Sequence, residues 1–226
     1  MFSIVIPLYN ECENIKSLLS EIFTNLYSYD NFEIILVDDA STDNTIGVIK
    51  KVIDNKVKIL NNKTNRGQSF SIHKGIQHSS FDTIITIDGD GQNDPADIPK
   101  LINKYFESDK LKLLGGIRSK RKDSLIKVLS SKIANKIRSK ILNDGCQDTG
   151  CSLKVFDKKI FLTFPYFDGM HRFIPALYRG YGFETNFINV NHRKRKYGTS
   201  KYGTINRLFK GIRDIIKVRN ILKNKI

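Results

Sequence analysis

The chain has 226 residues, its formal net charge at pH 7 is +15, and 40% of its residues are hydrophobic. This length and apolar content are enough for a folded core, which excludes a disordered chain. No run reaches the roughly 18 consecutive apolar residues of a membrane-spanning helix, so none is predicted. A strand-like segment follows Met1 directly and leaves no room for a signal peptide. We therefore expect a cytoplasmic protein whose three cysteines are reduced.

The first half of the chain alternates short apolar runs with amphipathic segments. Runs rich in Ile or Val with few charges are typical of strands that are buried on both faces. Such strands are predicted at Phe2–Leu8, Phe32–Val37, Val57–Leu60 and Asp82–Ile87. Helices are predicted at Glu13–Tyr27, Asn44–Ile53 and Gln68–Ser79. This order indicates an α/β fold, with a doubly wound, mostly parallel sheet and helices on both of its faces.

The second half is predicted to add strands and basic amphipathic helices. The strands are expected at Leu111–Ile117, Ser152–Phe156 and Phe183–Val190. A short helix near Arg172–Tyr178 must hold Pro175 in its first turn or be kinked by it. Apolar residues at helical spacing predict two longer basic helices, Leu125–Leu142 and Ile205–Leu222.

Most of the positive charge also lies in the second half. Residues 116–140 contain nine Lys or Arg and one acid, and residues 192–226 contain twelve and one. A basic surface of this kind attracts nucleic acid, anionic lipid headgroups or phosphorylated substrates. A lysine-rich surface without a polyanionic partner is the alternative, and composition alone does not choose between them.

Polar and acidic residues follow each of the four predicted strands of the first half. Ligands of open α/β sheets bind beyond the carboxyl ends of the strands, so these segments form the candidate site. They are residues 7–11, 38–43, 65–67 and 88–92.

Asp88 and Asp90 flank a glycine after the fourth predicted strand. Mg²⁺ and Mn²⁺ prefer oxygen ligands and keep open positions for phosphate, so two carboxylates at this point suit either cation. Such a metal would offset the charge of a leaving nucleoside diphosphate. The alternative is a surface turn, because Asp-Gly is a common turn dipeptide.

Asp38 and Asp39 follow the second predicted strand. Adjacent carboxylates there can accept hydrogen bonds from a nucleobase N–H or a ribose hydroxyl. The alternative is a cap of the following helix, a role that Ser41 or Asp43 already suits.

Together these segments resemble glycosyltransferase family 2. The residues that carry the resemblance are 2–11, 36–45, 65–67 and 88–95 in the first half, and 116–118, 131–135, 148–151, 171–177 and 195–202 in the second. Within the family, the chain is similar to the polyprenyl-phosphate sugar transferases, the group of dolichyl-phosphate mannosyltransferase and its undecaprenyl-phosphate relatives. The likeness covers nearly the whole chain.

The resemblance implies a GT-A fold and a set of site residues. The residues expected at the nucleotide are Pro7, Tyr9, Glu11, Asp38, Asp39 and Asp88, with Arg195 and Lys201 closing over the donor diphosphate. The residues expected at the metal, Mg²⁺ or Mn²⁺, are Asp88, Asp90 and Gln92. The residues expected at the acceptor phosphate are Arg118, Lys127, Ser131 and Lys132, where Lys127 replaces an arginine that relatives often carry.

The catalytic residues are expected to be Asp90, Arg118 and Asp148. Asp148 would act as a base or as an orienting partner, or it is a turn residue before Gly150. A lipid phosphate is mostly dianionic near pH 7, so it is already a nucleophile and needs nearby cations more than a base. In-line attack at the anomeric carbon would invert its configuration.

We therefore predict an inverting glycosyltransferase that moves a sugar from a GDP- or UDP-linked donor to a polyprenyl phosphate. One alternative is a family 2 transferase with a soluble glycan or protein acceptor. The other is a nucleic-acid-binding protein, which the net charge alone suggests. An acidic crevice would repel a phosphate backbone, and no nucleic-acid-reading motif is recognised, so we expect no nucleic-acid partner.

We expect a single GT-A-like domain over residues 1–226. Residues 1–115 would bind the nucleotide sugar, residues 116–202 the acceptor, and residues 203–226 would form a basic tail. The helices within 125–142 and 205–222 have apolar faces bordered by Lys and Arg, which is typical of helices that lie in a membrane interface. Packing on the domain or between two subunits is the alternative. We expect a peripheral protein on the cytoplasmic face of a membrane, as a homo-oligomer or with a membrane-anchoring partner.

Overall fold

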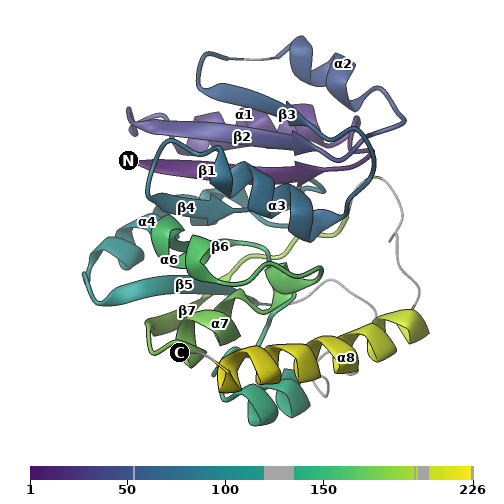
Figure 1. Cartoon of the computed structure of the whole chain (residues 1–226). Coiled ribbons are helices and arrows are strands. Elements are labelled where there is room, and N and C mark those ends of the chain that lie inside the picture. Colours follow the sequence, from purple (N-terminus) through teal and green to yellow (C-terminus); the bar gives the residue numbers. More distant parts are fainter. Residues whose placement is uncertain (53, 120–134, 196, 198–203, 225–226) are drawn as a thin grey trace.

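The computed structural model describes residues 1–52, 54–119, 135–195, 197 and 204–224, without the side chains of 204–210. Its centre is a seven-stranded sheet in the order β3-β2-β1-β4-β6-β5-β7 (Figure 1). The strands are β1 (Phe2–Leu8), β2 (Phe32–Asp38), β3 (Val57–Asn61), β4 (Thr83–Thr86), β5 (Leu111–Arg118), β6 (Lys154–Asp157) and β7 (Glu184–Val190). Neighbouring strands are parallel except around β6, which is antiparallel to β4 and β5. The predicted α/β fold with a mostly parallel sheet is confirmed.

Helices connect most of these strands. They are α1 (Ile15–Asn25), α2 (Thr45–Lys50), α3 (Gln68–Gln77), α4 (Ile98–Phe106), α6 (Lys158–Thr163), α7 (Ile174–Gly180) and α8 (Thr204–Lys223), with 3₁₀ turns η1 (Pro95–Asp97) and η2 (Met170–Arg172). Residues 135–142 are also helical. We did not predict α4 or α6, whereas Pro175 lies in the first turn of α7, as its ring requires. In the part of the chain described here, no helix is both long and apolar enough to cross a membrane.

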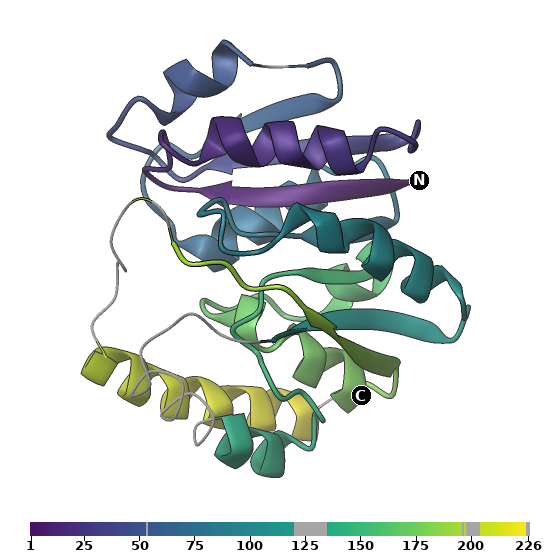
Figure 2. The same cartoon turned by 180° about the vertical axis from the view of Figure 1, so that it is seen from behind.

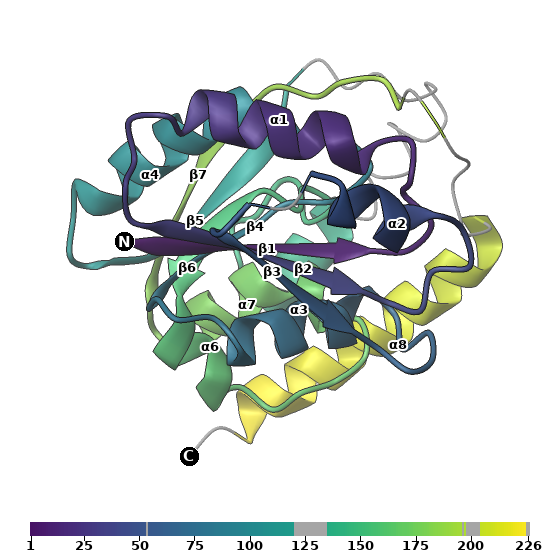
Figure 3. The ribbon, with the colours of Figure 1, turned by 90° about the horizontal axis from the view of Figure 1, so that it is seen from above.

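The helices cover both faces of the sheet (Figure 3). Helices α1, α2 and α4 share one buried apolar cluster with the sheet, and α3, α6 and α7 share another. In β1, Ile4 and Ile6 belong to the first cluster and Val5 to the second, because successive side chains on a strand point to opposite faces. Gly75 lets α3 approach closely, since a Cβ there would lie 2.5 Å from a methyl carbon of Val5. Because helices cover both faces of the sheet, β1 and β2 are largely apolar and contain few polar residues, such as Ser3 and Glu33.

Helix α8 and residues 135–142 lie at the β7 end of the sheet (Figures 1 and 2). One face of α8 packs on the domain: Val218 is fully buried, and Asp214 accepts a hydrogen bond of 2.6 Å from the guanidinium of Arg172. The opposite face leaves Ile212 and Ile216 51% and 55% exposed. Packing on the domain is therefore confirmed for one face of α8, whereas membrane contact through the exposed isoleucines stays a prediction.

Candidate functional site

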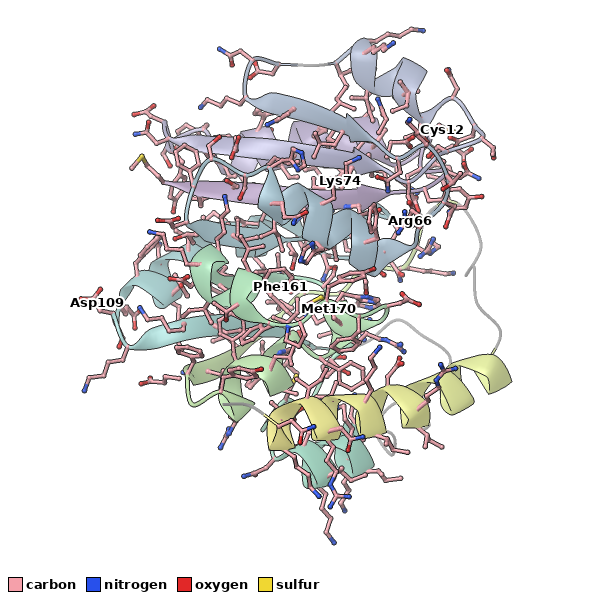
Figure 4. All side chains as sticks on the ribbon, in the orientation of Figure 1. Cys12, Arg66, Lys74, Asp109, Phe161 and Met170 are labelled. Atoms are coloured by element: carbon pink, nitrogen blue, oxygen red, sulfur yellow. The ribbon has the colours of Figure 1, made fainter. Side chains whose placement is uncertain are left out.

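The carboxyl ends of the first four strands meet at one edge of the sheet. Figure 4 shows Cys12 and Arg66 at this edge and Asp109 at the opposite one. The loops after β1 and β2 are joined, because the backbone N–H of Asn10 donates to Oγ of Ser41 at 2.9 Å, and Oδ1 of Asn10 accepts from the N–H of Thr42 at 2.7 Å. Asn10 adopts a left-handed conformation with φ of 54°, which asparagine tolerates well. The predicted convergence of these segments is confirmed.

Asp39 joins the loop after β3 to this edge. Its Oδ1 accepts from Nδ2 of Asn62 at 2.7 Å and from the N–H of Arg66 at 2.8 Å. Its Oδ2 accepts from the N–H of Gly67 at 2.7 Å. Gly67 has a φ of 85°, where a side chain would be strained. The carboxylate of Asp39 therefore shapes the turn that begins α3, and its direct contact with a nucleotide stays a prediction.

Asp38 differs from Asp39, because only one of its carboxylate oxygens accepts a hydrogen bond within the described residues. The side chain is 5% exposed, and Oδ2 accepts from the N–H of Ser41 at 3.2 Å. Oδ1 is buried and has no hydrogen-bond partner among the described residues. An unsatisfied buried oxygen is costly, so this atom suits a donor group supplied by a ligand.

The other predicted nucleotide residues of β1 lie at the same edge. Pro7 and Tyr9 are partly buried at the end of the strand. Glu11 is buried, and its carboxylate accepts from Nδ2 of Asn14 at 2.8 Å. Glu11 also supplies backbone carbonyl acceptors at the start of α1. The structure thus gives Glu11 a local role in holding the β1 loop.

Asp88 is fixed by partners from two other segments. Its Oδ1 accepts from Nε2 of Gln68 at 2.7 Å, and its backbone N–H donates to Oγ of Ser152 at 3.1 Å. Burial, followed by the charge of Asp90, raises the pKa of Asp88 to about 6. Lys154 and Arg118 oppose this rise through their positive charges. Asp88 is therefore a carboxylate whose negative charge is best stabilised by an added cation.

Gly89 permits this arrangement. A Cβ at this position would lie 2.4 Å from a methyl carbon of Leu8 and 3.3 Å from the carbonyl oxygen of Pro7. The Asp-Gly-Asp loop therefore packs directly on the end of β1, and only glycine fits between the two carboxylates.

Asp90 is paired with a cation of the chain itself. Its Oδ2 forms an ion pair with the guanidinium of Arg195, and its Oδ1 accepts from the N–H of Gln92 at 3.1 Å. The side-chain amide of Gln92 lies 3.5 Å from the carbonyl oxygen of Arg193. The structure thus brings together Asp90 and Gln92, predicted at the metal, and Arg195, predicted at the donor diphosphate. Among the described residues, no group of three or more His, Cys, Asp or Glu could hold a metal.

Arg118 and Asp148 form the second polar centre of the site. The guanidinium donates to both carboxylate oxygens, at 2.7 Å and 2.8 Å, and the backbone N–H of Arg118 donates to Oδ2 at 3.1 Å. Both side chains are largely buried. A Cβ at Gly150 would lie 2.6 Å from the guanidinium, so this glycine makes room for the pair. This geometry favours the orienting role for Asp148 over the role of base, and neither role is tested.

Four predicted site residues lie outside the described part of the chain. They are Lys127, Ser131, Lys132 and Lys201. The predicted acceptor-phosphate site is therefore represented here by Arg118.

Sequence reasoning missed several residues that support the site. Gln68 and Ser152 hold Asp88, and Lys154, which is 3% exposed, donates to the carbonyl oxygen of Cys151 beneath it. Ser69 lies 2.5 Å from Nδ1 of His171 and so ties α3 to η2. Gln68 and Ser69 directly follow the Asn-Arg-Gly segment, and this position was the only signal that could have found them.

Comparison with known proteins identifies the family of the chain and agrees with its fold. A model of glycosyl transferase family 2 matches residues 3–163. The chain is 35% identical to dodecaprenyl-phosphate galacturonate synthase of Rhizobium johnstonii over 99% of its own length. It is 34% identical to undecaprenyl-phosphate 4-deoxy-4-formamido-L-arabinose transferase of Shewanella sediminis over 90% of its length. The chain therefore belongs to glycosyl transferase family 2.

Both relatives are longer than the match: the chain spans 68% of the length of the first and 62% of the length of the second. Among solved structures, glucosyl-3-phosphoglycerate synthase from Mycobacterium tuberculosis, in complex with Mn²⁺, UDP-glucose and phosphoglyceric acid, superposes with a TM-score of 0.74 at 15% identity. That likeness covers 100% of this chain and 81% of the other, and it confirms the GT-A-like fold. The names of the two relatives give no support to a mannosyl specificity.

Proposed function

We propose that the chain is an inverting hexosyltransferase that moves a sugar from a nucleotide sugar to a polyprenyl phosphate. The observation that carries this proposal is the charge arrangement at the sheet edge. Asp88 and Asp90 lie together, with the guanidinium of Arg195 on Asp90, and Arg118 is close enough to Asp88 to influence its pKa. Two sources of positive charge around a carboxylate pair are what the joining of two phosphate-bearing substrates requires.

The residues of the site fit a divalent cation. Asp88 and Asp90 supply hard oxygen ligands. Burial and then the charge of Asp90 raise the pKa of Asp88, and a cation between the two carboxylates would offset both effects. Mg²⁺ or Mn²⁺ held there would stabilise the negative charge of the departing nucleoside diphosphate. Gln92 lies beside Asp90 and would complete the set.

The chain's own groups would bind and align both substrates. The buried Oδ1 of Asp38 would accept a hydrogen bond from the nucleotide base or ribose, and Pro7, Tyr9, Glu11 and Asp39 would complete the nucleotide site. Arg118, oriented by Asp148, would hold the acceptor phosphate. The lipid phosphate oxygen would attack the anomeric carbon in line, so the fixed orientation of Arg118 contributes by alignment.

The acceptor proposal also agrees with the β7 end of the molecule. Ile137, Ile141, Ile212 and Ile216 are exposed there, on two helices that also carry Lys and Arg. Exposed apolar side chains bordered by cations are typical of helices that lie in an anionic membrane surface. We propose peripheral membrane binding through this surface, defined as the four isoleucines and hereafter called the isoleucine surface.

A radiolabel transfer assay tests the proposed function. The purified protein would be incubated with Mn²⁺ or Mg²⁺, membranes that contain polyprenyl phosphate, and GDP- and UDP-linked sugars that include a uronic acid and an amino-pentose. Label in the organic phase from wild type, reduced at least about 100-fold in Asp90→Asn, is the expected result. Label in water-soluble products alone would favour a soluble acceptor. Equal transfer by both proteins would contradict the role of Asp90.

A further inference from the structure

Arg195 follows two residues that are held in place by contacts with other segments. Asn93 and His192 form an antiparallel bridge, and the N–H of Arg193 donates to the carbonyl oxygen of Gln92 at 2.8 Å. The guanidinium of Arg193 also pairs with Asp94 at 2.6 Å and with Glu21 of α1. Residues 192 and 193 are therefore fixed beside residues 92–94, which follow the Asp-Gly-Asp loop, and the guanidinium of Arg195 lies against Asp90.

Both carboxylate oxygens of Asp90 already have a partner in the chain. Its side chain is 12% exposed, with Oδ1 accepting from the N–H of Gln92 and Oδ2 paired with Arg195. A divalent cation at Asp90 needs the same carboxylate and would lie close to the guanidinium. Two cations at that separation repel each other strongly where water is scarce. Arg195 and a divalent cation are therefore competitors for Asp90.

We propose that Arg195 is an exchangeable counter-ion of Asp90, so that a divalent cation enters the site efficiently only together with a nucleoside diphosphate. The diphosphate offers the displaced guanidinium an equivalent set of oxygen acceptors, to which arginine binds well. The exchange therefore couples the two ligands: each one improves the binding of the other. This inference rests on the proposed function and adds to it a coupling between cation and nucleotide binding.

The test is a comparison of Mn²⁺ binding in two states, by titration calorimetry or by the electron paramagnetic resonance signal of free Mn²⁺. Arg195→Gln is compared with wild type and with Lys194→Gln, which removes the same charge from the exposed neighbouring residue. With Mn²⁺ alone, Arg195→Gln is expected to bind roughly fivefold or more tightly than either. With UDP or GDP present, the order reverses, and Arg195→Gln binds the Mn²⁺–nucleotide pair more weakly.

These opposite changes separate an exchange from a simple electrostatic effect. Mn²⁺ binding by Arg195→Gln that is no tighter than binding by Lys194→Gln would overturn the exchange and leave the metal site intact. If wild type bound no Mn²⁺ with or without nucleotide, and Asp90→Asn behaved identically, both the exchange and the proposed metal site would be rejected. Thermal unfolding of each variant confirms that it is folded.

Discussion

Asp39 is the residue on which the loop after β3 depends. Its two oxygens accept three hydrogen bonds, two of them from backbone N–H groups. In Asp39→Asn one oxygen becomes an NH₂ group that faces these donors, so we expect a loss of about 1–3 kcal/mol in the free energy of unfolding. Urea unfolding measures the loss. Asp109→Asn, at an exposed turn, is the control and should change stability by less than about 0.5 kcal/mol.

Asp88 gives the folded protein a specific pH dependence. Its pKa is raised from the ordinary value of 3.8 to about 6, first by burial and then by Asp90. Between these values the folded chain holds more protons than the unfolded chain, so the contribution of Asp88 to stability falls as the pH rises through this window. Asp88→Asn should remove this contribution.

The measurement is urea unfolding of wild type and Asp88→Asn in EDTA at pH 4 and pH 7. The free energy of unfolding of Asp88→Asn minus that of wild type should be larger at pH 7 than at pH 4. Replacing EDTA by Mn²⁺ together with UDP or GDP should narrow that gap by stabilising the ionised wild-type site. If the difference in free energy of unfolding between the two proteins were the same at both pH values, Asp88 would have an ordinary pKa in the folded protein.

At the scale of elements, α8 combines a packed face with an exposed one. Ile212 and Ile216 are more than half exposed, so replacing both by serine should alter the free energy of unfolding by less than about 0.5 kcal/mol. The same replacement removes half of the isoleucine surface and should weaken binding to vesicles that contain anionic lipids. Vesicle sedimentation measures this binding.

The matched control is Leu162→Ser on α6. Leu162 is 37% exposed and lies outside the isoleucine surface, so its loss should leave vesicle binding unchanged. Equal binding by wild type and the Ile212→Ser, Ile216→Ser variant would argue against membrane contact through α8.

At the scale of the whole molecule, the site joins loops that follow separate strands of one sheet. A ligand bound across them stabilises the folded chain alone, by an amount that grows with its concentration relative to its Kd. We expect Mn²⁺ with UDP or GDP, at about 100 times the Kd, to add about 2.7 kcal/mol to the free energy of unfolding. Thermal unfolding with and without EDTA measures the effect, and an unchanged Tm with every nucleotide would contradict nucleotide binding.

The fold class and the edge that holds the site could be predicted from sequence, because both depend on local patterns. Apolar runs such as those of β1 and β2 mark strands buried on both faces, and parallel strands bring their carboxyl ends to one edge. The segments that end in Asp38–Asp39 and in Asp88–Asp90 could therefore be placed together before any contact was known. The short helices α4 and α6 were not predicted, and the residues that form them were assigned to no element.

The α/β sheet, the carboxylates at its edge and the family resemblance follow from residue type and spacing along the chain, so the amino-acid sequence is enough to predict them. The pairing of the charges is visible only in the folded chain. Arg118 meets Asp148 from 30 residues away, Arg195 meets Asp90 from 105 residues away, and Gln68 reaches Asp88 across the sheet edge. The tertiary structure also decided which face of α8 is buried. The physical reason is that ion pairing and burial depend on distances in space between segments remote in sequence, which no local pattern encodes.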